Sequence, residues 1–264
     1  ETGKIDALVD EQKRLIELLK EKRQAVISHA VTKGLDPNVR MKSSGVEWLG
    51  DVPEHWDVGP LKGYWSVTDC KHITAEFVGD GIPLASIREA QSYFVDLSDA
   101  KLTTPDYFEI LVEGGRRPRP GDLIFTRNAT VGEVAQVAEW HPPFAMGQDV
   151  CLLRRIARAQ VPDFLQFMLR STSAVQQLDL SMVGATFKRV NVEAIRNMIF
   201  AWPPLGEQRA IADTLLESTA SMDKLINAAE KAITLLVERR SSLISAAVTG
   251  KIDLRDFAAQ EEAA

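Results

Sequence analysis

The sequence lacks the features of a membrane protein, a disulfide-stabilised protein or a metalloprotein. Its 264 residues contain no uninterrupted apolar run of about 18 residues, so we expect no membrane span. Only two cysteines occur, Cys70 and Cys151, and neither lies in a paired-cysteine motif. This predicts reduced thiols in a cytoplasmic protein. Asp69, Cys70 and His72 are close in sequence, but a strand sends successive side chains to opposite faces, so we expect no metal site there.

The sequence also lacks the motifs of the common catalytic sites. It has no glycine-rich phosphate loop and no dinucleotide-binding fingerprint. The stretch HPPF (His141–Phe144) superficially resembles the catalytic tetrapeptide of amino-methyltransferases. That motif needs Asn, Asp or Ser in its first position to hold the target amine, and no cofactor motif accompanies it here. We therefore predict a protein without catalytic residues and without a cofactor of its own.

Positive charge is scarce overall but is concentrated in one part of the chain. The net charge is −6, which argues weakly against a nucleic-acid partner. Residues 34–113 contain six Lys and Arg against fourteen Asp and Glu, whereas residues 114–196 contain eleven against seven. A phosphate backbone responds to local charge, so a basic face on an acidic protein remains compatible with DNA binding.

A long internal repeat is the most informative feature that is present. Residues 2–32 and 219–249 are identical at thirteen of 31 aligned positions, and the segment TGKID occurs at Thr2–Asp6 and again at Thr249–Asp253. The identities include residue types that are usually exposed, such as Glu21 and Glu238. Repeats of this length indicate a duplicated structural unit, so we interpret the two ends of the chain together.

Each copy of the repeat predicts a long amphipathic helix. Apolar residues recur at helical spacing, no proline interrupts either copy, and about 28 residues of helix extend about 40 Å. Each helix needs a long partner, and the other copy is the natural one, in either a parallel or an antiparallel rod. The predicted pairing residues are Leu8, Leu15, Leu19, Val26, Leu225, Ile226, Leu236 and Leu243.

The segment between the helices predicts one α+β domain. Prolines, glycines and three tryptophans fill residues 35–65, which indicates loops and short elements anchored on a core. Strands are expected at residues 121–127, 130–140, 149–156 and 198–202, and helices at 162–170 and 173–180. We predict a helix over 1–33, a globular domain over 34–206, a second helix over 207–250 and a tail over 251–264.

Polar and basic residues cluster in three loops of the basic part of the chain. The stretch FTRNATVG follows a predicted strand, GATFKRVN contains no acid, and GRRPRPG forms a basic turn. Lys and Arg neutralise phosphates, Thr and Asn bond phosphates or base edges, and Arg can form two hydrogen bonds to guanine. The predicted DNA-binding residues are Arg116, Arg117, Arg127, Asn128, Thr130, Thr186, Lys188 and Arg189.

Four stretches of the sequence resemble the specificity subunits of type I restriction–modification systems. SGVEWLGDVPEHWDV (Ser44–Val58) is similar to the opening of a target-recognition domain in that family, and GDLIFTRNATVG (Gly121–Gly132) to its central strand and loop. PPLGEQRAIADTLL (Pro203–Leu216) is similar to its closing segment, and Arg14–Pro37 resembles the spacer helix. The Pro-Pro-Leu-x-Glu-Gln run before a long helix is the most specific of these features.

The resemblance implies a non-catalytic subunit that binds double-stranded DNA. Members of the family carry two target-recognition domains, each reading half of a split site, and two spacer helices that set the gap. They recruit methyltransferase subunits, which carry S-adenosylmethionine, and restriction subunits. This chain has one such domain flanked by two helices, so we expect self-association through the helices. A DNA methyltransferase or nuclease, and a coiled-coil adaptor without DNA binding, remain the alternatives.

Overall fold

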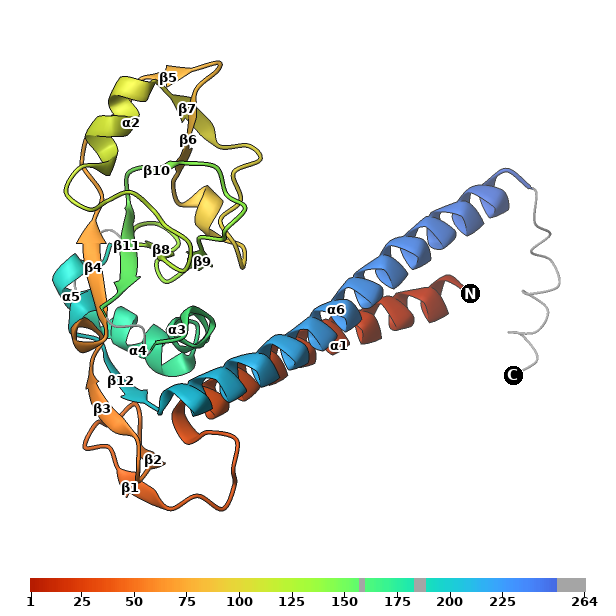
Figure 1. The fold of residues 1–264 in the computed structure, drawn as a ribbon. Coiled ribbons are helices and arrows are strands. Elements are labelled where there is room, and N and C mark those ends of the chain that lie inside the picture. Colours follow the sequence, from red (N-terminus) through yellow and green to blue (C-terminus); the bar gives the residue numbers. More distant parts are fainter. Residues whose placement is uncertain (157–159, 183–188, 251–264) are drawn as a thin grey trace. The chain divides into compact units, whose positions relative to one another are not determined.

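The computed structural model describes residues 1–156, 160–182 and 189–250 and divides the chain into two compact units (Figure 1). The helical unit joins Glu1–Ala25 to the part of the chain that begins at Leu216. The mixed unit consists of Val26–Leu215. Within the described ranges, no helix combines the length and apolar character that crossing a membrane requires. This architecture, helices at both ends of an α+β domain, confirms the predicted fold class.

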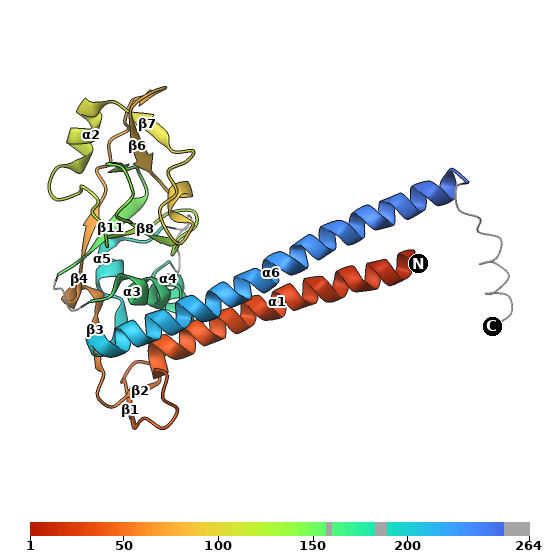
Figure 2. The same ribbon diagram turned by 45° about the vertical axis from the view of Figure 1, so that its right-hand side comes forward.

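Two long helices pair in the helical unit. Helix α1 spans Thr2–Lys33 and helix α6 spans Leu205–Val248. They run side by side in opposite directions, as both views show (Figures 1 and 2). Gly34 follows the end of α1 with a φ of 77°, a left-handed conformation that glycine adopts without steric cost. The sequence left the direction of the pair open, and the structure makes it antiparallel.

The apolar seam of the helix pair overlaps the predicted pairing face only in part. Its centre contains Ile16, Ile226 and Ala229, with Leu19 and Ile233 packed against them. Of the predicted pairing residues, Ile226 is buried, while Leu19, Val26, Leu236 and Leu243 are partly buried.

Leu8, Leu15 and Leu225 are instead exposed, at 45%, 42% and 55%. On helix α1, Leu8 and Leu15 each directly precede a buried residue, Val9 and Ile16, and lie on the exposed flank of the apolar side. Periodicity located the apolar side of the helix but did not fix its rotation about the axis.

Two ion pairs join equivalent positions of the repeat on α1 and α6. Arg23 pairs with Asp223 at 3.6 Å, and Arg240 pairs with Asp6 at 2.7 Å. Asp6 is the repeat equivalent of Asp223, and Arg23 is the equivalent of Arg240. The two ion pairs therefore form between equivalent residues, and an internal twofold rotation relates one pair to the other. Exposed pairs contribute about 0–1 kcal/mol each, so their main effect is on direction and register.

The mixed unit contains a central antiparallel sheet with the strand order β4–β11–β8–β9. Strand β11 lies between its two neighbours, so Cys151 pairs with Asp69 on one side and with Phe125 on the other. This sheet carries the candidate site, because its strands end at the loops that were predicted to bind DNA. The strands are β4 (Trp65–Asp69), β8 (Leu123–Thr126), β9 (Val134–Gln136) and β11 (Val150–Arg155).

The other strands of the mixed unit form three further sheets, one with four strands and two with two strands. The second four-stranded sheet has the order β10–β6–β7–β5, in which only the β10–β6 pair is parallel. Its strands are β5 (Phe77–Val78), β6 (Ile82–Ala85), β7 (Lys101–Thr103) and β10 (Ala145–Met146). The two-stranded sheets pair β1 (Met41–Ser43) with β2 (Asp51–Pro53) and β3 (Asp57–Pro60) with β12 (Ile199–Trp202).

Short capped helices connect these strands. Thr104 caps α2, Ser171 caps α4, and Asn191 caps α5 by accepting a hydrogen bond from the Glu193 amide at 2.9 Å. The helices are α2 (Pro105–Val112), α3 (Pro162–Leu169), α4 (Thr172–Ser181) and α5 (Val192–Arg196), with 3₁₀ turns η1 (Leu61–Gly63) and η2 (Arg88–Ala90).

A buried glutamine fixes α3 against the edge strand β9. Gln166 is fully buried and donates hydrogen bonds to the carbonyls of Tyr93 and Val134, at 2.8 and 3.1 Å. It accepts one from Gln136 at 3.0 Å. Buried amides need such partners, so this network specifies how α3 sits on the sheet that carries the candidate site.

Candidate nucleic-acid interface

The loop after β8 is held in a compact turn. The Thr126 hydroxyl bonds the Thr130 carbonyl and accepts a hydrogen bond from the Glu133 amide at 3.0 Å. The Gly132 amide donates to the Thr126 carbonyl at 3.2 Å. The strand predicted over residues 130–140 is therefore shorter, because the chain turns until Val134 before β9 begins. Within the turn, Thr130 is exposed and Asn128 is half-buried.

Two loops that are distant in sequence meet at Asn128. Asn128 forms an isolated antiparallel bridge with Arg189, and the Val190 amide donates to the Arg127 carbonyl at 2.9 Å. Arg189 is exposed, and among the described residues its side chain has no hydrogen-bond or ion-pair partner. Thr186 and Lys188 lie outside the described residues. The bridge joins two of the three predicted DNA-binding segments into one surface, which we call the loop surface (Asn128–Thr130 and Arg189).

Arg127 does not lie on the loop surface, although it was predicted to bind DNA. It is 3% exposed, and its guanidinium pairs with Asp69 Oδ1 at 2.7 Å. Its amide donates to the Asp149 carbonyl at 2.8 Å. In this conformation its charge is directed into the protein, and a base could not reach the guanidinium.

The basic turn before β8 is also engaged in contacts within the protein. Arg116 donates to the Asp69 carbonyl at 2.8 Å and to the Glu113 carbonyl at 2.9 Å. Arg117 pairs with Glu109 at 3.0 Å, and its guanidinium lies 5.0 Å from the centre of the Phe108 ring. Both residues remain predictions as DNA contacts, but part of their charge is already neutralised or used to hold this turn.

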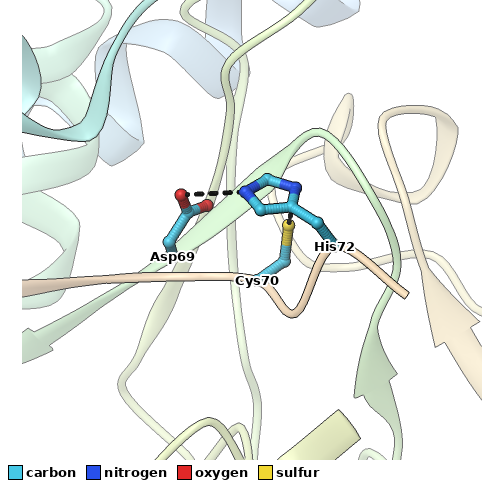
Figure 3. A group of neighbouring side chains, drawn as sticks. All are labelled: Asp69, Cys70 and His72. Carbon is cyan, nitrogen blue, oxygen red and sulfur yellow. Dashed lines mark hydrogen bonds and ion pairs between the residues drawn. The ribbon is translucent and has the colours of Figure 1, made fainter.

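Asp69, Cys70 and His72 form a cluster whose side chains do converge (Figure 3). His72 Nε2 lies 3.3 Å from Asp69 Oδ2, its Nδ1 lies 3.9 Å from Cys70 Sγ, and one possible ligand atom from each residue falls within 4.8 Å of the others. The prediction that strand alternation would keep these side chains apart was wrong, because β4 ends at Asp69 and Cys70 and His72 lie beyond the strand.

The electrostatics of this cluster do not favour a metal ion. The Arg127 guanidinium already forms an ion pair with the Asp69 carboxylate and offsets its negative charge. Burial raises the pKa of the Cys70 thiol, with a further contribution from the charge of Asp69, so a protonated thiol lies beside the ion pair. The arrangement is better described as an ion pair with a neighbouring thiol and imidazole.

His141, at the end of the β9 connection, predicts a pH dependence of stability. The Ala138 amide donates to His141 Nδ1 at 2.9 Å, and burial lowers the pKa of the imidazole. Below its ordinary pKa of about 6.5, the unfolded chain binds a proton that the folded protein excludes. We expect stability to fall as the pH falls through this value and to level off below the lowered folded pKa.

Urea unfolding of the wild type and of His141→Gln between pH 8 and pH 5 measures this effect. The glutamine cannot gain a proton, so the difference in free energy between the two proteins should change over that range. A difference that is constant with pH would show that His141 does not contribute to the pH dependence.

Comparisons with known proteins find similarity to specificity subunits of type I restriction enzymes. Residues 116–235 match the family model for the type I restriction modification DNA specificity domain. The MjaVIII type I restriction enzyme specificity subunit of Methanocaldococcus jannaschii is 22% identical over 96% of this chain and 58% of its own length.

Two solved structures share the fold. A chain from a study of complex assembly and conformational transition in the type I R-M system has a TM-score of 0.61 at 17% identity, over 93% of this chain and 57% of that one. The HsdS subunit of Thermoanaerobacter tengcongensis has a TM-score of 0.58 at 15% identity, over 95% and 57%. This chain thus spans little more than half the length of these relatives.

Proposed function

We propose that this chain, which is similar to specificity subunits of type I restriction–modification systems over little more than half their length, reads one half of a split DNA target. In this proposal the target-recognition domain comprises residues 34–206 and has no catalytic role. Methyltransferase subunits, which supply S-adenosylmethionine, and restriction subunits perform the chemistry. The spacer helices are residues 1–33 and 207–250.

The observation that carries the proposal is the convergence at the Asn128–Arg189 bridge. Asn128 and Thr130 offer hydrogen-bonding groups suited to base edges or phosphates, and Arg189 offers an exposed charge beside them. The three residues come from two loops that are about 60 positions apart in sequence, and only folding brings them together. Thr186 and Lys188, which precede Arg189 in the chain, remain proposed contacts.

We expect Arg189→Gln to weaken DNA binding about equally for all sequences. If Arg189 contacts a phosphate, DNA binding by the variant releases about one counterion fewer than binding by the wild type. The slope of log binding constant against log salt concentration should then flatten by about one unit. Fluorescence anisotropy with a random-sequence duplex pool, measured over a salt series with the methyltransferase subunit present, tests this.

Asn128→Ala should instead change the preferred sequence. The variant should lose about 1–3 kcal/mol of discrimination between base pairs.

Arg239→Gln is the matched control, since Arg239 is an exposed arginine on α6 in the helical unit. Its salt dependence should equal that of the wild type. Wild-type protein that binds no DNA at low salt would exclude the DNA-reading function and favour an adaptor.

The helix pair offers a surface on which partner subunits could dock. Leu8 and Leu18 on α1 are 45% and 53% exposed, and their repeat equivalents Leu225 and Leu235 on α6 are 55% and 65% exposed. Large exposed apolar side chains that gather on one surface are typical of protein-binding sites. We propose that these leucines contact the methyltransferase subunits.

We also propose that two copies of the chain associate through α1 and α6. The contacts within the helix pair are related by an internal twofold, so α1 of one copy could pair with α6 of another through the same residues. Such a dimer would carry two identical recognition domains and would read a palindrome interrupted by a fixed gap.

A further inference from the structure

We propose that Arg127 and Asp69 form a positioning pair that holds the loop surface in the shape required to read sequence. This inference rests on the proposed function and assigns Arg127 a role different from base contact. Arg127 acts through its neighbours, and the residues that touch DNA are Asn128, Thr130 and Arg189.

The location of the pair supports a positioning role. Asp69 is the last residue of β4, and Arg127 directly follows β8. These strands flank β11, where Cys151 pairs with both Asp69 and Phe125. The 2.7 Å ion pair therefore connects β4 and β8 across the start of β11, at the end of the sheet where the loops leave.

The backbone of Arg127 connects the ion pair to both halves of the loop surface. Its amide donates to the Asp149 carbonyl, and its carbonyl accepts from the Val190 amide, at 2.8 and 2.9 Å. The next residue, Asn128, bridges to Arg189. A shift of Arg127 would therefore move the β8 loop and the Arg189 segment together.

The burial of the Arg127 side chain supports a positioning role and opposes direct contact with bases. The Arg127 side chain is 4% exposed, whereas Asp69 is 32% exposed. Removing the Asp69 carboxylate would leave the buried Arg127 guanidinium without its counterion, so Asp69 should be needed to hold Arg127 in place. An arginine that reads bases would need an exposed guanidinium and would not require Asp69.

Binding measurements on Asp69→Asn, Arg127→Gln and the double variant test the pair. The target is first selected from a random duplex pool with wild-type protein and the methyltransferase subunit. Each single variant should bind this target about tenfold more weakly and random DNA almost normally, with an unchanged salt slope. The double variant should bind no more weakly than the weaker single variant, because both changes break the same contact.

Near-ultraviolet circular dichroism checks that each variant is folded. If Arg127→Gln does not fold, Arg127→Lys and Asp69→Glu keep the charges and should retain more of the discrimination than Asp69→Asn. Glu113→Gln is the matched control, because it removes an exposed carboxylate paired with Lys71, and it should bind as the wild type does.

Two results would overturn the inference while leaving the proposed function intact. One is wild-type discrimination in Asp69→Asn combined with a changed preference at a single base pair in Arg127→Gln, which would make Arg127 a direct reader. The other is unchanged binding in both single variants. If the wild type shows no salt-dependent DNA binding, the proposed function itself fails.

Discussion

Asp122→Ala is expected to lower the free energy of unfolding by about 3–5 kcal/mol, the usual cost of removing one partner from a buried ion pair. The Asp122 side chain is 5% exposed and accepts hydrogen bonds from Arg154 at 2.6, 3.0 and 3.2 Å. It also accepts one from the Arg119 amide at 2.8 Å. Arg154 additionally donates to the carbonyls of Gly115 and Arg117, so the substitution leaves a charge held in place without its counterion.

Urea unfolding at pH 7 measures this loss, with Asp10→Ala as the control. Asp10 and its partner Lys13 are both well exposed, so their 3.6 Å pair should contribute about 0–1 kcal/mol. If Asp122→Ala cost no more than Asp10→Ala, the Asp122–Arg154 contact would not be a stabilising element of the mixed unit.

Leu19→Asp combined with Leu236→Asp is expected to halve the mass of the protein in solution. For the wild type at micromolar concentration, the proposed self-association predicts a mass near twice the chain mass of 29.2 kDa. The two leucines are repeat equivalents and are partly buried, and Leu19 packs against the seam. A carboxylate at each position would face apolar neighbours and oppose pairing of the helices. Sedimentation equilibrium measures the mass.

Leu18→Asp with Leu235→Asp is the matched control, since these repeat-equivalent leucines are more than half exposed. This variant should keep the mass of the wild type but recruit the methyltransferase subunit more weakly. A wild-type mass of 29.2 kDa at high concentration would contradict self-association and would leave the DNA-reading proposal untouched.

The sequence predicted the helices well because each has a repeated copy and an uninterrupted apolar period. It did not predict which way the helices run relative to each other. The information was present in the repeat: in an antiparallel pair, Asp6 can lie opposite Arg240 while Asp223 lies opposite Arg23, and both pairs occur. The rotation of each helix depends on side-chain packing, which periodicity alone does not fix.

Compact apolar runs predicted the strands β8, β11 and β12, because a buried strand needs such a run. The strand expected over residues 130–140 was too long, since its valines alternate but its first part is a turn. Ala129 and Gly132 adopt φ angles of 57° and 101°, which a regular strand excludes. Hydrophobic alternation does not report the backbone angles that end a strand.

The candidate site was predicted as a set of loops and not as an arrangement of side chains. Arg127 and Arg189 look equivalent in the sequence, since each lies in a polar stretch of the basic part. Burial distinguishes them: Arg127 has a counterion in Asp69, a residue far away in the chain, and Arg189 is exposed. Nothing near Arg127 in the sequence identifies Asp69 as its partner.

The twofold relation between α1 and α6 has a consequence for stoichiometry. At these ion pairs the two ends of the helix pair are equivalent, because a half-turn exchanges Asp6 with Asp223 and Arg23 with Arg240. A binder that recognises only the thirteen residues shared by the two copies meets them again, in the same order, on the other flank. Sites built from the repeat therefore occur in twos, and an odd number of bound partners would require one copy to be blocked.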